Sequence, residues 1–165
     1  MIRLEPISPE NFEAVIALQA ALEQSKFVAS NLYSIAQAKV YPECVALAAF
    51  DNDQAVGFAM YCPDRADGEY WTRRLMVDRD CQRKGFGEVI LHGVLQRIMA
   101  DLSRHRVYIS FEPDNHAARA LYEKLGFART GEPLRGKRFT ASIMAKKTAY
   151  NPKIFRCTRP RNMLY

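Results

Sequence analysis

The sequence has no hydrophobic run long enough to cross a membrane, since its longest apolar stretch, CVALAAF from Cys44, has only the length of a strand. The first residues, MIRLEPISPE, lack the apolar centre of a signal peptide, so we expect a cytoplasmic protein without a membrane partner. The four cysteines form no CxxC pair and accompany no histidine cluster. This pattern excludes the common zinc-site spacings, favours reduced thiols over disulfides, and predicts no metal cofactor.

Acidic residues are absent from residues 146–165. The basic residues of that segment are Lys146, Lys147, Lys153, Arg156, Arg159 and Arg161. Because the whole chain of 165 residues has a formal net charge of +6, residues 1–145 balance to zero. The high isoelectric point therefore belongs to the C-terminal segment, and nucleic acid is not expected as a partner of the rest. We expect one globular domain over 1–145 and a basic extension, disordered or loosely docked, over 146–165.

Hydrophobic periodicity predicts an α+β domain with a mixed, mostly antiparallel sheet of about six or seven strands and helices on both faces. The expected strands span 2–7, 45–50, 55–62, 69–78 and 106–111, with two weaker ones at 128–131 and 138–145. The expected helices run from Ser8-Pro9 through Leu22, from Ser30 or Asn31 to Pro42, over about 85–102, and from Asp114 to Gly126.

The stretch QRKGFG (82–87) places two basic residues and two glycines directly before an apolar helical pattern. A strand, a glycine-rich turn and a helix in this order present free backbone N–H groups and a positive helix end to an anion. The P-loop pattern is absent, and Ile90 stands where the dinucleotide fingerprint requires a third glycine. Two interpretations stay open, namely a turn that only redirects the chain and a seat for a diphosphate.

Two motifs in order carry a family resemblance. The segment QRKGFG follows RLMVD (74–78), and NHAARALYEKLGF (115–127) comes about thirty residues later. Together they resemble the core motifs of the GNAT superfamily of acyl-CoA-dependent N-acetyltransferases, over residues 1 to about 131. Segments 27–43, 56–61 and 68–78 are also similar to bacterial spermine/spermidine (diamine) N-acetyltransferases.

This resemblance implies a GNAT-type sheet whose fourth and fifth strands splay apart around the pantetheine arm of acetyl-CoA. It assigns contacts with pantetheine to Leu75, Met76 and Val77. It assigns the diphosphate to Gln82, Arg83, Lys84, Gly85, Phe86 and Gly87. No metal is implied, and by analogy the chain could form a homodimer.

Acetyl transfer needs a neutral amine and a proton for the departing thiolate. The resemblance makes Tyr122 the acid that supplies this proton. Tyr122 also lies on an apolar stripe with Ala118, Leu121 and Leu125, which is typical of a core residue, so both interpretations are kept. Asn115 is expected either to contact the cofactor or to cap the following helix.

The general base has no motif of its own. Glu43 and Glu69 flank segments expected at the acceptor site, where a partly buried glutamate of raised pKa could relay a proton through water. A solvated surface position is the alternative for each. Asp64, Asp67 and Glu69 cluster before the fourth expected strand, where they could attract a polycation or form an ordinary polar turn.

The sequence departs from the family at two places. Arg73-Arg74 stand where mammalian enzymes of this activity carry an acidic pair, and strand alternation predicts that the two side chains lie on opposite faces. From Pro133 onward the chain continues as a basic segment where the family normally ends after one strand.

We therefore expect an acetyl-CoA-dependent N-acetyltransferase that acts on a small polycationic amine such as spermidine or spermine, by direct attack in a ternary complex. One alternative keeps the chemistry and changes the acceptor to an aminoglycoside, a peptide N-terminus or another amine. Another is a non-catalytic module that binds coenzyme A while its basic segment contacts nucleic acid.

Overall fold

The computed structural model describes residues 2–101 and 106–128. Its elements in chain order are β1 (Ile2–Pro6), α1 (Phe12–Ala17), α2 (Asn31–Val40), β2 (Val45–Asp51), β3 (Gln54–Pro63), β4 (Tyr70–Val77), the 3-10 turn η1 (Arg79–Cys81), α3 (Phe86–Met99), β5 (Val107–Ile109) and α4 (His116–Lys124). The α+β class predicted from periodicity is confirmed.

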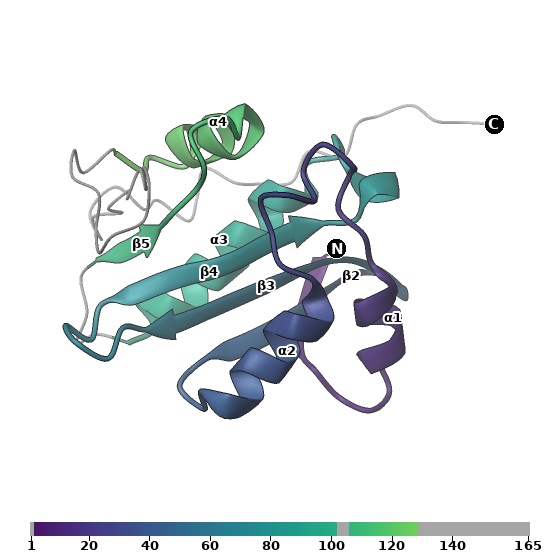
Figure 1. The fold of residues 1–165 in the computed structure, drawn as a ribbon, viewed down its shortest axis with the longest axis horizontal. Helices are drawn as coiled ribbons and strands as arrows, with labels where there is room; N and C mark the ends of the chain where they lie inside the picture. The colour runs from purple at the N-terminus through teal and green to yellow at the C-terminus, as the bar shows by residue number, and fades with distance from the viewer. Residues whose placement is uncertain (1, 102–105, 129–165) are drawn as a thin grey trace.

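The described strands form one sheet in the order β1-β2-β3-β4-β5 (Figure 1). The first three pairings are antiparallel and only β4–β5 is parallel, so the mostly antiparallel character is also confirmed. The described residues contain five strands, fewer than the six or seven expected. The weaker strands expected at 128–131 and 138–145, and the basic extension at 146–165, lie at or outside the end of the described residues.

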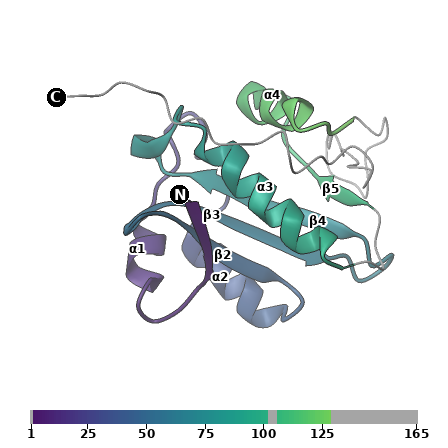
Figure 2. The ribbon, with the colours of Figure 1, turned by 180° about the vertical axis from the view of Figure 1, so that it is seen from behind.

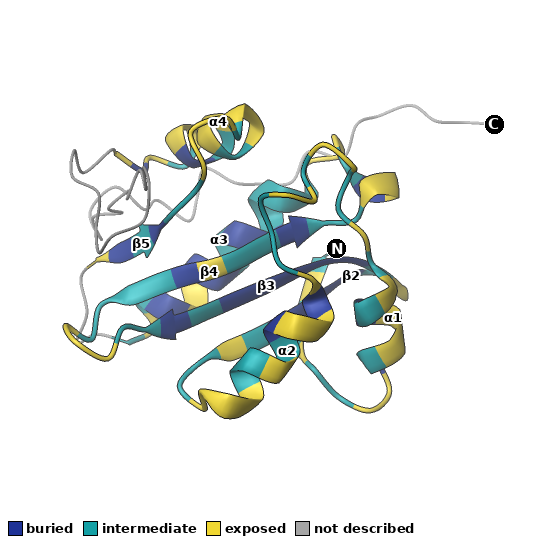
Figure 3. Cartoon of the chain, viewed as in Figure 1, coloured by how far each residue is buried: buried dark blue, intermediate teal, exposed yellow. Residues whose placement is uncertain are grey.

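Helices cover both faces of the sheet, as predicted. In Figure 1 α1 and α2 lie over one face, and Figure 2 shows α3 across the other face with α4 beside its beginning. Each face has its own hydrophobic core, and the strands between them, β2 and β3, are buried along most of their length (Figure 3). The buried residues of α3 are Ile90, Leu91, Val94, Leu95 and Ile98. Each such side chain contributes about 1.5–3 kcal/mol by leaving water.

The first helix is shorter than its periodicity predicts. It begins at Phe12 instead of Pro9, because the Asn11 carboxamide accepts a hydrogen bond from the Ser8 backbone N–H and donates one to the Pro6 carbonyl. It ends at Ala17, and Leu22 is 89% exposed. The chain leaves the helix because the backbone N–H of Gln19 donates to Asp78, 59 positions away, at 2.9 Å.

The other helix ends follow local signals more closely. The Ser30 hydroxyl caps α2 by accepting a hydrogen bond from the Tyr33 N–H, as expected. Helix α4 is capped by Asn115, so the expected start at Asp114 is wrong by one residue. Its end at Gly126 is confirmed: this glycine has φ +81°, and the Phe127 N–H donates back to the Tyr122 carbonyl.

A β-bulge interrupts β4 at Arg73. Met60 pairs with Arg74 and Tyr61 pairs with Thr72, which leaves Arg73 without a cross-strand partner. Arg73 donates to the Cys62 sulfur, and Arg74 donates to the Ser34 hydroxyl of α2. The alternation that was expected to place the two arginines on opposite faces is therefore wrong, because the extra residue turns both side chains toward the α2 side of the sheet.

The splay of β4 from β5 is confirmed. Their parallel pairing joins only Tyr70–Thr72 to Val107–Ile109, and beyond Thr72 no described strand lies on that side of β4.

Gly57 lies where β3, β4 and α3 approach one another closely, so a substitution at this position tests that approach. A Cβ at this position would lie 2.6 Å from the Met76 carbonyl oxygen and 2.7 Å from the Ile90 side chain. We expect Gly57→Ala to lower the free energy of unfolding by about 1–3 kcal/mol, measured by urea denaturation, because a backbone atom cannot yield.

Gly93→Ala is the matched control within α3. Its Cβ would meet only the flexible end of Leu4, at 2.6 Å, and alanine favours the helix by up to about 1 kcal/mol over glycine. Equal destabilisation by both substitutions would contradict the close approach at Gly57.

Candidate active site

The edge of β4 that faces away from β3 is free where the two parallel strands have parted. Leu75, Met76 and Val77 pair with β3 through Ala59, Phe58 and Gly57, and no described strand pairs with them on the other side. An unpaired strand edge presents backbone donors and acceptors to the amides of an extended ligand. The predicted contacts of these three residues with pantetheine stay a prediction, for which this geometry is suited.

The glycine-rich turn lies at the end of the same strand and opens α3. Gly85 is the N-cap residue of α3 with φ +83°, a left-handed conformation that glycine adopts without strain. Within the described residues the backbone N–H groups of Gly85, Phe86 and Gly87 donate no hydrogen bond, and the first intrahelical donors are Glu88 and Val89. Free N–H groups at the positive end of a helix favour a bound anion.

The polar side chains of the glycine-rich turn differ in whether they bond within the protein or lie exposed beside the helix end. Gln82 uses its amide within the protein, because Nε2 donates to Gln24 at 2.9 Å and to the Val77 carbonyl at 3.2 Å. Lys84 Nζ donates to the Asp80 carbonyl at 3.0 Å, and the exposed Arg83 has φ +62°. Gln82 therefore fixes the turn against β4, while Arg83 and Lys84 supply positive charge beside the helix end.

Helix α4 closes this part of the molecule. A Cβ on Gly87 would lie 3.5 Å from the Leu121 side chain and 3.6 Å from the Val77 side chain, so β4, α3 and α4 meet at this glycine. Lys124 forms an ion pair of 2.6 Å with Glu88, which holds α4 against the first turn of α3.

Tyr122 lies on the buried face of α4, next to that meeting point. Its ring packs edge-on against Phe111, with centroids 5.4 Å apart, and against Phe127. Only 6% of the residue is exposed, and this burial raises the pKa of its phenol well above the ordinary value. The expectation of a core residue is confirmed, and the role of acid stays a prediction.

Asn115 is the N-cap of α4, and its side-chain oxygen accepts a hydrogen bond from the Ala118 N–H at 3.1 Å. The capping interpretation is therefore confirmed. A contact between Asn115 and the cofactor stays a prediction.

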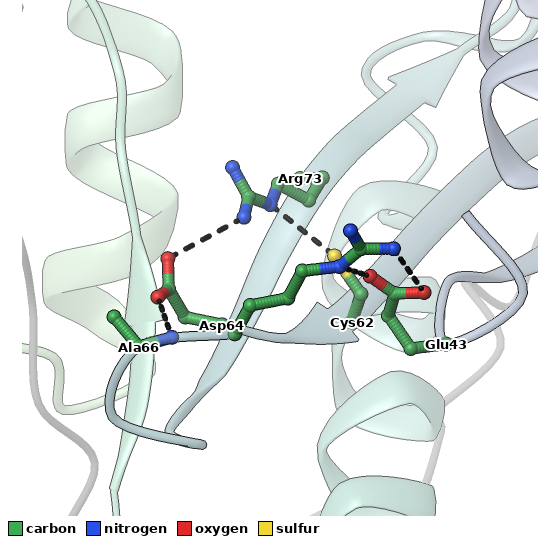
Figure 4. A network of polar contacts seen from close by, with 6 residues as sticks. Glu43, Cys62, Asp64, Ala66 and Arg73 are labelled. Atoms are coloured by element: carbon green, nitrogen blue, oxygen red, sulfur yellow. Dashed lines mark hydrogen bonds and ion pairs between the residues drawn. The ribbon is translucent and has the colours of Figure 1, made fainter. Parts of the chain in front are cut away.

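Glu43 lies in the loop between α2 and β2, in a network of polar contacts (Figure 4). Its carboxylate forms a two-pronged ion pair with Arg65, with the shorter contact at 2.5 Å. The Arg65 hydrogen bond lowers the pKa of Glu43. A base at this position would need a raised pKa, and the ion pair with Arg65 has the opposite effect, while a catalytic role of Glu43 stays a prediction.

The same network contains Arg73, which contacts Asp64 at 3.7 Å and the sulfur of Cys62 at 3.2 Å (Figure 4). Arg74 is half-buried and donates to Ser34 and Gln37 of α2. The guanidinium groups of Arg73 and Arg74 thus both have partners inside the protein.

Glu69 lies just before β4. One oxygen of its carboxylate is buried and has no hydrogen-bond partner among the described residues. The same holds for the Trp71 indole N–H and the Thr72 hydroxyl, which follow it along the strand. Asp67 accepts a hydrogen bond from the Glu69 backbone N–H, so the polar turn expected at 64–69 is present.

The sequence did not indicate that Gln24 and Arg65 contact candidate site residues. Gln24 meets Gln82 across 58 positions, and Arg65 meets Glu43 across 22, so no local pattern indicates either contact. The bulge at Arg73 was missed as well, although it decides where both arginines point.

The described residues contain neither a candidate metal site nor a candidate membrane-spanning helix. No group of three or more histidine, cysteine, aspartate or glutamate side chains there is arranged to hold a metal ion. None of the helices in this part of the chain combines the length and the apolar character that a membrane crossing requires.

The fold and the site define a class of protein in which two strands of the sheet diverge next to a helix N-terminus suited to bind an anion. Residues 12–127 match the model of the acetyltransferase (GNAT) family. The chain belongs to this family, whose members take an acetyl group from acetyl-CoA.

Curated relatives extend over most of the chain. It is 28% identical over 138 residues to the spermine/spermidine N(1)-acetyltransferase of Bacillus subtilis strain 168, which covers 79% of this chain and 90% of the relative. A probable spermine N(1)-acetyltransferase of Bacillus subtilis subsp. natto matches to the same extent.

Solved structures share the fold at lower identity. An aminoglycoside acetyltransferase in complex with coenzyme A and kanamycin is 14% identical, with a TM-score of 0.74, and covers 90% of this chain and 96% of its own. The spermidine N-acetyltransferase of Vibrio cholerae in complex with CoA and spermine is 15% identical, with a TM-score of 0.66, covering 87% and 92%.

Gly87→Ala separates cofactor binding from stability. The new methyl group makes only ordinary contacts with Val77 and Leu121, and alanine favours the helix, so thermal stability should stay equal or rise. If the cofactor lies against this backbone, the methyl group takes its space, and we expect calorimetry to show at least ~10-fold weaker binding of coenzyme A, a loss of about 1.4 kcal/mol.

Gly93→Ala, in the same helix but facing Leu4, is the control that should leave coenzyme A affinity unchanged. Undiminished binding by the Gly87 variant would place the cofactor elsewhere.

Proposed function

We propose that this acetyltransferase transfers the acetyl group of acetyl-CoA to a primary amine of a polyamine such as spermidine or spermine. The amine attacks the thioester directly, within a ternary complex. The observation that carries the choice of acceptor is the similarity to curated spermine acetyltransferases over 138 residues, which includes the segments around β3 and β4.

Acidic groups near the start of β4 support a cationic acceptor. The buried oxygen of Glu69 has no partner among the described residues, and an ammonium group would supply the missing hydrogen bond. Glu43 and Asp64 lie near the end of β3, and their side chains are only 24% and 14% exposed.

Arginines already neutralise part of this charge. Arg65 forms an ion pair with Glu43 and also lies over the Tyr41 ring, 5.1 Å from its centroid. The Arg65 side chain is 68% exposed, and an exposed ion pair contributes at most about 1 kcal/mol, so an ammonium group can replace it at small cost. A carboxylate beside an aromatic ring then suits one ammonium of a polyamine.

The attacking amine must lose a proton, since an alkyl ammonium has a pKa of ~10.4. Glu43 is a weak base because its ion pair with Arg65 lowers its pKa. We therefore propose Glu69, acting through water, as the better candidate for the base, and a binding role for Glu43.

Tyr122 is proposed to assist the leaving sulfur. Burial raises the pKa of its phenol, so the hydroxyl keeps its proton throughout the working pH range. When acetyl-CoA is bound, it supplies the acetyl thioester and leaves as a thiol. Because a thiol is a stronger acid than this phenol, full proton transfer from Tyr122 is uphill, and its main contribution is a hydrogen bond to the charge that develops on sulfur.

Tyr122→Phe removes the hydroxyl and keeps the ring that packs against Phe111 and Phe127. We expect turnover to fall at least ~10-fold, with coenzyme A affinity and thermal stability close to those of the parent. Steady-state kinetics and calorimetry measure the two quantities. Turnover equal to that of the parent would remove Tyr122 from the mechanism.

Neutralising Glu43 and Glu69 together tests the acceptor site. Hydrogen bonds to charged groups contribute about 1.5–3 kcal/mol each, so the Glu43→Gln, Glu69→Gln double variant should raise the spermidine KM at least ~10-fold. Arg65→Ala should change KM in the opposite direction, because it frees Glu43 for the substrate.

Asp53→Asn is the matched control, since Asp53 is a fully exposed acid in the turn at the opposite end of β2. An unchanged KM in the double variant would reject these two carboxylates as the acceptor site. An acetyl-CoA-dependent thiol-release assay over spermidine, spermine, an aminoglycoside and a peptide then distinguishes the acceptors. Release with none of them would favour a module that binds coenzyme A without catalysis.

A further inference from the structure

Cys44 and Cys62 face each other at the end of the β2–β3 hairpin. Val45 pairs with Tyr61 and Ala46 with Met60, so the same register continued by one residue sets Cys44 opposite Cys62. Directly opposed residues of antiparallel strands have Cα atoms about 4.5 or 5.5 Å apart. Both separations lie within the range of about 4.4–6.8 Å that a disulfide requires.

The two thiols are also in contact. Burial, together with a hydrogen bond to Cys62, raises the pKa of Cys44 to about 12. Cys62 is buried, whereas Cys44 is only partly so, and both are free thiols. No CxxC spacing indicates this pair, because it is formed by strand pairing across the hairpin.

Arg73 distinguishes Cys62 from Cys44 and Cys81, the other cysteines that the structure describes, because only Cys62 among them accepts a hydrogen bond from it. Its Nε donates to the Cys62 sulfur at 3.2 Å, and this contact exists because the bulge turns the arginine toward β3. A guanidinium beside a sulfur compensates negative charge on it during nucleophilic attack. Cys81 lies in the hydrophobic core on the opposite face of the sheet, and its described hydrogen bond comes from the Gln54 amide at 3.7 Å.

We propose that Cys44 and Cys62 are a redox-modification site, which a hydroperoxide closes to a disulfide and a dithiol reopens. The Cys62 sulfur attacks the peroxide as a thiolate, breaks the O–O bond and becomes a sulfenic acid, while the second oxygen leaves as water or alcohol. The Cys44 sulfur then displaces the hydroxyl of the sulfenic acid as water. In total the two thiols lose two electrons and two protons, and the peroxide takes up both.

The new bond would alter the polar network described above. Cys44 follows Glu43 directly, and Cys62 is two residues before Asp64, so the disulfide joins the two chain segments that carry these acids. It also removes the thiol to which Arg73 donates. The site does not depend on the identity of the acceptor amine.

The test uses the full chain with hydrogen peroxide as the probe. After treatment with stoichiometric peroxide, we expect the intact mass of the chain to be lower by ~2 Da. Alkylation of the treated chain should then modify two fewer cysteines than in the untreated chain, and digestion should yield a peptide pair that joins residues 44 and 62. Dithiothreitol should restore the original mass. The parent chain alone is sufficient for this measurement, so the result does not depend on whether a variant folds.

Cys81→Ser is the control that should leave the crosslink unchanged, whereas Cys44→Ser should abolish it. Oxidation that adds oxygen to Cys62 without a crosslink would overturn the proposal. So would a crosslink that uses Cys81 or Cys157 in place of this pair.

Discussion

Parallel pairing between β4 and β5 covers only Tyr70–Thr72, and this short ladder decides where a ligand can enter the sheet. Beyond it, β4 keeps β3 on one side, and no strand of the described residues pairs with its other edge. The strand then ends in the glycine-rich turn, where three N–H groups at the start of α3 donate to no partner in the described part of the chain. A longer β4–β5 ladder would satisfy the strand internally and remove the opening between backbone donors and helix end, so the proposed cofactor site depends on the ladder stopping at Thr72.

Charge on the acceptor side is arranged in pairs, which limits what binding can gain. Glu43 is matched by Arg65 and Asp64 by Arg73. A polycation entering there exchanges one partner for another, so its affinity reflects the difference between two ion pairs. The buried oxygen of Glu69 has no hydrogen-bond partner in the described part of the chain, although the carboxylate interacts electrostatically with Arg106. A full contribution from a new hydrogen bond is therefore expected mainly at that carboxylate.

Features that depend on neighbouring residues could be predicted from the sequence, and features that depend on distant contacts could not. The Ser30 cap, the end of α4 at Gly126 and the hairpin of β2 and β3 follow from local chemistry. The early end of α1 depends on a bond from Gln19 to Asp78, and the positions of both arginines depend on the bulge opposite Met60. The candidate cofactor residues could be predicted because they form a contiguous motif, whereas the partners of Glu43 and Gln82 come from remote parts of the chain.

The linker between α1 and α2 is anchored twice to the end of β4, by the backbone of Gln19 at Asp78 and Arg79 and by the side chain of Gln24 at Gln82. Anyone who grafts a different linker onto this scaffold to change its substrate range would also disturb the support behind the glycine turn. Weaker binding of the acetyl donor by such a chimaera would then reflect the lost support of the glycine turn and would give no information on the substrate preference of the new linker. Grafts that retain Gln24 and the backbone hydrogen bonds of Gln19 are the ones in which the two effects stay separate.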